Sequence, residues 1–148
     1  RSTLFPYTTL FRSRDRGIRN NNPLNIRKGN NWQGEVLNQT DKAFEQFQSM
    51  EYGLRAGFKL LKNYITGRNG HYQPCDTIEK IIGRWAPPNE NNTRNYVATV
   101  CKHTGLHERE VINFNDRKQM VAIVRAMAFV ECGVWVDEKV IESAYDLV

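Results

Sequence analysis

Short segments with helical periodicity fill the sequence after Met50, and this pattern constrains the fold more than any other feature. In the first segment, apolar residues recur at steps of four, three and four, which places them on one face of an α-helix. These residues are Leu54, Phe58, Leu61 and Ile65. The glycine-containing stretch 67–70 ends this predicted helix.

Four further helices are predicted from capping residues and apolar spacing. Their predicted N-terminal capping residues are Asp76, Thr93, Asp116 and Asp137. The predicted stops of the first three are the Pro87–Pro88 pair, Gly105 and Gly133. The sequence therefore predicts a mostly helical domain from Met50 onward.

The segment before Met50 has a different character. Residues 15–34 are rich in Asn, Gly and Arg, which is typical of turns. Two short apolar pieces, Leu24 with Ile26 and residues 43–47, predict small strands around a turn at residues 28–31. We therefore predict an α+β fold class, mostly helical, with a small irregular β element near the N-terminus.

The first thirteen residues, R-S-T-L-F-P-Y-T-T-L-F-R-S, resemble a translated sequencing adapter. They show no sustained helical or strand period and none of the parts of a signal peptide. We expect residues 1–13 to be an artefact without structure and residues 14–148 to form a single domain.

Composition excludes several protein classes. With 40% apolar, 25% charged and 11% aromatic residues, the chain is an ordinary globular protein and has no membrane-spanning apolar run. The net charge of +5 falls to about +3 without Arg1 and Arg12, and no Lys or Arg stripe accompanies the aromatic residues. A nucleic-acid-binding module is therefore disfavoured.

The sequence offers no metal or cofactor motif. Cys75, Cys101 and Cys132 are widely spaced, which predicts reduced thiols rather than a zinc site or a disulfide framework. The three histidines lack a zinc spacing, and no phosphate-binding glycine loop is present. We expect neither a metal nor a cofactor.

Glu131 is the most informative position for chemistry. It continues the apolar stripe of Met120, Val124 and Met127 at a step of four, so its carboxyl lies on the core side of the helix. It also sits in the last helical turn, where the helix dipole disfavours an anion. Both effects favour the protonated carboxyl, as a general acid for glycosidic cleavage requires. The alternative is that Glu131 points to solvent or pairs with an arginine.

Other side chains are candidates for sugar binding. Flat aromatic rings near element ends can stack on sugar rings, and amides can bind acetamido groups. The selected substrate-binding residues are Asn22, Asn25, Trp85, Tyr96 and Trp135. Each of them is also a candidate for an ordinary core, cap or turn role. Glu90 is the candidate second catalytic carboxyl, and Glu45 is a weaker one.

Three motifs in one order resemble a family of phage and prophage proteins that are commonly labelled virion or structural proteins. The motifs are R-G-I-R-N-N-N-P-L-N-I-R at 16–27, F-E-Q-F-Q-S-M-E-Y-G-L-R-A at 44–56 and W-A-P-P-N-E-N-N-T-R-N-Y at 85–96. The resemblance covers nearly all of residues 14–148. It implies a fold of the lysozyme-like superfamily.

A more distant resemblance, to bacterial endo-N-acetylglucosaminidases, bears on mechanism. N-N-P-L-N-I-R at 21–27, F-E-Q-F-Q-S at 44–49 and the segment 85–96 resemble three motifs of those enzymes. Their catalytic E-S-G-W-like segment, which comes first in them, is similar to E-C-G-V-W at 131–135. The resemblance implies a circular permutation, with Glu131 as the catalytic acid. The alternative is that an upstream catalytic helix has been lost.

The function predicted from the sequence is cleavage of peptidoglycan glycan strands by a glycosidase or lytic transglycosylase, with Glu131 protonating the leaving oxygen. The alternative is a non-catalytic virion structural protein or glycan-binding module on the same fold. The expected partners are glycan strands and other virion proteins. The expected location is the virion, or the periplasm or cell wall of a bacterial host.

Overall fold

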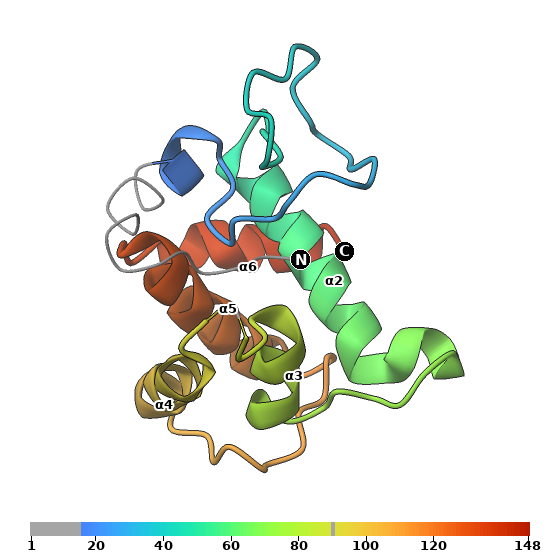
Figure 1. The fold of residues 1–148 in the computed structure, drawn as a ribbon, viewed down its shortest axis with the longest axis vertical. Helices are drawn as coiled ribbons and strands as arrows, with labels where there is room; N and C mark the ends of the chain where they lie inside the picture. The colour runs from blue at the N-terminus through green and yellow to red at the C-terminus, as the bar shows by residue number, and fades with distance from the viewer. Residues whose placement is uncertain (1–15, 90) are drawn as a thin grey trace.

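The computed structural model describes residues 16–89 and 91–148 and is mostly helical (Figure 1). The expectation for residues 1–13 and the candidate Glu90 lie outside the described residues. The helices are α2 (Met50–Gly70), α3 (Ile78–Trp85), α4 (Thr93–Thr104), α5 (Arg117–Cys132) and α6 (Glu138–Asp146). All five correspond to segments that the apolar spacing predicts, so the helical part of the fold prediction is confirmed.

The helix ends agree with the predicted stops. Gly105 and Gly133 adopt the left-handed conformation and cap α4 and α5. In α2, helical geometry breaks at Gly67, where positive φ angles begin. The N-terminal caps Asp116 and Asp137 are also confirmed, since each side chain accepts a hydrogen bond from a backbone N–H two or three residues on.

Two predicted caps are wrong by one residue. Thr77, not Asp76, caps α3, because Thr77 is the extended residue whose hydroxyl accepts a hydrogen bond from Lys80 N. Asn92, not Thr93, caps α4 and accepts from Asn95 N. In both places two adjacent polar residues can serve as caps, and the backbone conformation selects between them.

The helices enclose one apolar core. Helix α5 packs against α4 and α6, while α6 also packs against α2 (Figure 1). The predicted stripe of α5 faces this core, since Met120, Val124 and Met127 are completely buried. Burial of such side chains is the main stabilising contribution to a fold of this size.

The segment 16–49 covers one end of α2 (Figure 1). Residues 16–19 are helical where the sequence predicts turns, and the rest of the segment is irregular. Its β element is smaller than predicted: the described residues hold two isolated antiparallel bridges, Arg27 with Phe44 and Glu35 with Phe47, and no strand. The α+β prediction is therefore corrected to a mostly helical fold.

Side chains replace the missing strand ladder. The Asn22 amide donates to the carbonyls of Ile26 and Glu45 and accepts from Ile26 N, so it joins two backbone segments that a sheet would otherwise pair. The Gln39 side-chain amide likewise donates to the backbone carbonyl of Gln46 and accepts from the Gln46 N–H. Such local side-chain bonds compete with regular strands.

Candidate functional site

Glu131 lies in the last turn of α5 and is completely buried, with 0% of its surface exposed. The apolar register of α5 and the left-handed cap at Gly133 together fix this position. The prediction that Glu131 faces the core is confirmed, and the alternative that it points to solvent is wrong. A carboxyl in such a place requires hydrogen-bond donors, because an isolated buried charge is very unfavourable.

Three predicted site residues supply donors to Glu131. Tyr96 Oη donates to Glu131 Oε2 at 3.0 Å, and Trp85 Nε1 donates to the same oxygen at 3.2 Å. Asn25 Nδ2 lies 3.2 Å from Glu131 Oε1. All three donors are buried. The structure thus brings together the N-terminal loop, α3, α4 and α5 around one carboxyl, which we call the Glu131 cluster.

The electrostatics of the Glu131 cluster favour a fixed set of hydrogen bonds. Burial raises the pKa of Tyr96 well above its ordinary value, and the charge and hydrogen bonding of Glu131 raise it further. The Tyr96 hydroxyl therefore remains protonated and donates. Hydrogen bonds to a charged acceptor contribute more than neutral ones, about 1.5–3 kcal/mol each.

The Glu131 cluster lies apart from three cavities of the described residues. These have volumes of about 300, 150 and 240 Å³, and Glu131, Asn25, Trp85 and Tyr96 line none of the three. Cys132 follows Glu131 in the chain, and its buried thiol donates to Pro23 O of the N-terminal loop at 3.1 Å. A general acid must come within hydrogen-bond reach of its substrate. In this geometry the carboxyl is enclosed by the donors of Asn25, Trp85 and Tyr96, which it ties together.

The other predicted binding residues lie outside the Glu131 cluster. Asn22 is buried, and its side-chain amide donates to the backbone carbonyls of Ile26 and Glu45. Trp135 is 40% exposed and stacks on Phe129, with 4.3 Å between the ring centroids. The His103 ring meets the Trp135 ring edge-on, with 4.8 Å between the centroids. Trp135 lines the 150 Å³ cavity together with His103 and Arg125, and this cavity includes none of the other predicted site residues.

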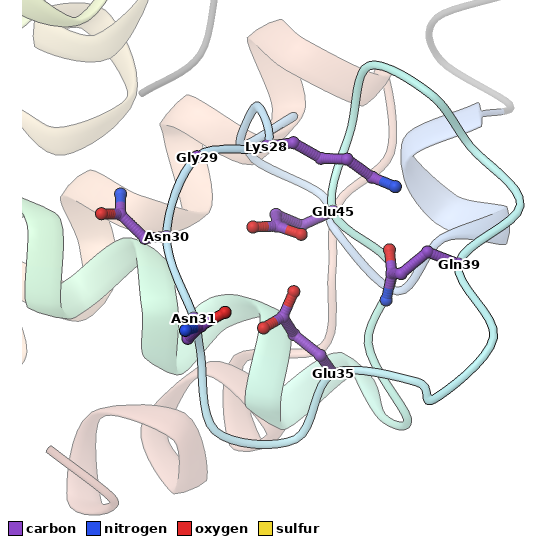
Figure 2. Close-up of a pocket in the computed structure, with 7 residues that line it drawn as sticks. All are labelled: Lys28, Gly29, Asn30, Asn31, Glu35, Gln39 and Glu45. Atoms are coloured by element: carbon purple, nitrogen blue, oxygen red, sulfur yellow. The ribbon is translucent and has the colours of Figure 1, made fainter.

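A polar pocket lies instead in the irregular segment. This pocket has a volume of about 300 Å³ (Figure 2). Its lining residues are Lys28, Gly29, Asn30, Asn31, Glu35, Gln39 and Glu45. The carboxyls of Glu35 and Glu45 point toward one another across it (Figure 2). We call this site the Glu35–Glu45 pocket.

Glu45 is 2% exposed. Burial raises the pKa of Glu45 to about 8, and hydrogen bonding to Glu35 and repulsion by its charge add to the shift, whereas Lys28 lowers it. The sequence analysis named Glu45 and missed Glu35. No local pattern in the sequence marks Glu35. Its position depends on the chain returning toward residues 44–47 after the turn at 28–31, where Glu35 forms a bridge with Phe47.

Among residues 16–89 and 91–148, no group of three or more His, Cys, Asp and Glu side chains is placed to hold a metal ion. In the same residues, no helix has the length and apolar content needed to cross a membrane.

Comparison with known proteins adds the biological context. No family model matches the chain. Protein P5 of Pseudoalteromonas phage PM2 is 37% identical to it over 134 residues, which span 88% of this chain and 78% of that protein. The chain belongs to the family of phage PM2 Protein P5. The phage part of the predicted resemblance is confirmed by this P5 relative, while the lysozyme-like likeness and the circular permutation stay predictions.

Proposed function

We propose that this P5-family protein is a structural component of a phage particle and that Glu131 stabilises its fold rather than reacting. The observation that carries the proposal is the complete burial of Glu131 beneath Asn25, Trp85 and Tyr96. A reacting carboxyl would have to meet a sugar there, and these donors occupy the space around its oxygens.

The family relationship supports the same proposal. The relative is a protein of a phage, and the sequence motifs resemble phage proteins commonly labelled virion or structural. The surface also offers apolar side chains for contacts with other virion proteins. Leu37 and Val111 are 98% and 70% exposed, on the irregular segment and on the loop before α5. Scattered exposed apolar residues are normal, so these two only mark where contacts would be sought.

The test has two arms. First, particles of the phage that encodes this chain are purified on a density gradient and their proteins are quantified by mass spectrometry; we expect the chain at a constant number of copies per particle. Second, the recombinant protein is incubated with peptidoglycan, and the products are searched for new reducing or anhydro ends; we expect none. Absence from the particles, or release of new ends, would contradict the proposal.

Glycan-strand cleavage is the second candidate, favoured by one observation. Asn25, Trp85 and Tyr96, which come from two of the three motifs that resemble glucosaminidases, all hydrogen-bond to Glu131. For cleavage, the cluster would have to open so that Glu131 protonates the leaving oxygen, with Glu90 as the candidate second carboxyl.

The peptidoglycan arm separates the candidates. An enzyme would release new ends that Glu131→Gln abolishes. A glycan-binding virion protein would release none and would still sediment with cell walls.

A further inference from the structure

We propose that a surface groove beside Trp135 binds a short acidic segment of another virion protein. One apolar side chain of that segment enters the groove, and its carboxylates lie against Lys118 and Arg125. The identity of the partner as a virion protein rests on the proposed function, whereas the binding itself does not.

The groove consists of two adjoining cavities of about 150 and 240 Å³, and we call it the Trp135 groove. Lys118 and Ala122 of α5 line both cavities, so the two meet along one face of that helix. From Asp116 to Arg125 this face measures about 14 Å, at a helical rise of about 1.5 Å per residue. An extended chain advances about 3.3 Å per residue, so the groove is long enough for about four residues of a partner.

Trp135 is a large side chain that the apolar core does not use. It stacks on Phe129 outside that core and is 40% exposed. The Arg125 guanidinium lies 5.3 Å from the centre of the Trp135 ring, and Arg125 Nε donates to Val136 O at 2.9 Å. These contacts hold the ring at the surface before a partner binds. Tryptophan and arginine beside a pocket are among the residues that contribute most to binding at protein interfaces.

The cavity next to Trp135 has the size of one side chain. An apolar cavity of about 150 Å³ accommodates a benzene ring. Val121 and Ala122 form apolar walls of this cavity together with Trp135. The cavity therefore fits a side chain such as leucine or phenylalanine.

The charges of the Trp135 groove favour an acidic partner. Its two acidic residues lie at helix N-termini, Asp116 as the cap of α5 and Glu138 in the first turn of α6. The helix dipole balances a negative charge at such a place. Lys118 and Arg125 lie between them on α5, and in the described part of the chain Lys118 forms no ion pair. Carboxylates of a partner would balance these two cations.

A sugar is the alternative ligand, because the sequence predicts Trp135 as a sugar-binding residue. Stacking of a sugar needs a free aromatic face. Phe129 covers one face of the Trp135 ring, with 9° between the ring planes, and Arg125 and His103 also lie against the ring. A protein segment needs only the cavity beside the ring, so the geometry favours the acidic segment.

The first test is calorimetric titration of the full chain with the peptide acetyl-Gly-Asp-Phe-Asp-Gly-amide. We expect saturable binding that weakens from about 0.1 M to about 1 M salt, because salt screens the charge pairs. The same peptide with Asn in place of both Asp should bind at least about tenfold more weakly. Equal binding of the two peptides, or no saturable binding of the acidic one, would overturn the proposal. So would saturable binding of chitotriose in place of the peptide.

Three variants locate the binding in the groove. Lys118→Glu reverses the charge of an exposed side chain, and Trp135→Ala removes a cavity wall; each should weaken peptide binding by about tenfold or more. Lys42→Glu is the matched control, because Lys42 is also exposed but lines neither cavity. Its binding should stay within about twofold of wild type. Urea unfolding verifies that each variant is folded, and folded Lys118→Glu that binds as wild type does would overturn the proposal.

Cross-linking in purified particles identifies the partner. A carbodiimide joins an amine directly to a neighbouring carboxyl, so Lys118 should become linked to an Asp or Glu beside an apolar residue of another virion protein. If the chain is present and Lys118 forms no such link, or links only to a second copy of this chain, the proposal is wrong. Absence of the chain from the particles would instead contradict the proposed function. The peptide titration would then still decide whether the groove binds an acidic segment.

Discussion

At the scale of single residues, Glu131 is a structural acceptor, and its removal has a predictable cost. Glu131→Ala leaves the buried donors of Asn25, Trp85 and Tyr96 without this acceptor and adds a cavity. We expect the free energy of unfolding to fall by about 3–5 kcal/mol in urea denaturation. Glu142→Ala, which removes a half-exposed carboxyl, should cost at most about 1 kcal/mol. Equal losses for the two variants would contradict the structural role.

Glu45 makes stability depend on pH in a defined direction. Its pKa is about 8 in the folded state against an ordinary 4.5, so between these values the folded chain holds a proton that the unfolded chain releases. The contribution is present at low pH and is lost as pH rises through the folded pKa, with a slope of up to about 1.4 kcal/mol per pH unit.

The measurement is urea unfolding of wild type and Glu45→Gln from pH 5 to pH 9 in the presence of a chelator. The variant should lack the decline that wild type shows across this window. Parallel curves would mean that the Glu45 carboxyl is not held protonated.

At the scale of elements, the contact between α2 and the loop before it depends on the absence of a side chain. A Cβ on Gly53 would overlap the Asn21 carbonyl. Asn21 has little freedom to move because its φ is 52°, its N–H donates to Ile18 O and its side-chain amide donates to Phe47 O. Gly53→Ala should therefore destabilise the fold by about 1–3 kcal/mol.

Gly83 in α3 is the matched control for this prediction. A Cβ there would meet no atom within 4 Å, so Gly83→Ala should stabilise by about 0.5–1 kcal/mol through helix propensity. Thermal unfolding of the two variants should move in opposite directions. A gain in stability from both would show that α2 and the loop are not in close contact.

Asp41 organises the irregular segment in place of a sheet. It accepts hydrogen bonds from Arg16 through two nitrogens, from Asn20, and from the backbone of Ala43 and Phe44. The Arg16 guanidinium and these donors hold the pKa of Asp41 well below its usual range. Asp41→Asn should lower the free energy of unfolding by about 2 kcal/mol at pH 7, allowing for the partial exposure of Arg16.

The pH dependence of this contribution is opposite to that of Glu45. Because the folded pKa is depressed, the stabilisation is present above the ordinary value of 3.8 and is lost as pH falls below it. Wild type and Asp41→Asn should therefore converge in stability between pH 4 and pH 2. Asp146→Asn, on an exposed pair with Arg117, serves as the control and should show a smaller effect at pH 7.

At the scale of the whole molecule, local signals predict the helices correctly and overestimate the β element. Apolar spacing and glycine stops act within a few residues, and for this reason the five helices and most of their ends are predictable. The pairing of Asn22 with Glu45, and of Glu35 with Phe47, joins distant residues through side-chain amides and single bridges, which leave no period in the sequence.

The candidate site is likewise predictable from the sequence only in part. The register of α5 predicts that Glu131 faces inward, and the motifs select Asn25, Trp85 and Tyr96 as its neighbours. Whether such a cluster is open or sealed depends on the packing of all four segments, which no local pattern contains. The Glu35–Glu45 pocket depends on the course of an irregular loop and was equally out of reach.

The Glu131 cluster joins the N-terminal loop to α3, α4 and α5, and this predicts energetic coupling between residues far apart in sequence. Asn25 and Tyr96 donate to different oxygens of the same carboxyl, so the loss of one donor should change the cost of losing the other. A double-mutant cycle of Asn25→Gly and Tyr96→Phe should give a coupling free energy of about 0.5–2 kcal/mol.

Glycine is chosen because Asn25 has a φ of 52°, where alanine would add strain unrelated to the hydrogen bond. The same cycle in a Glu131→Leu background is the control, and there the two changes should be additive within about 0.5 kcal/mol. Additivity in both backgrounds would mean that the carboxyl does not connect the segments and that the helices and the loop are stabilised separately.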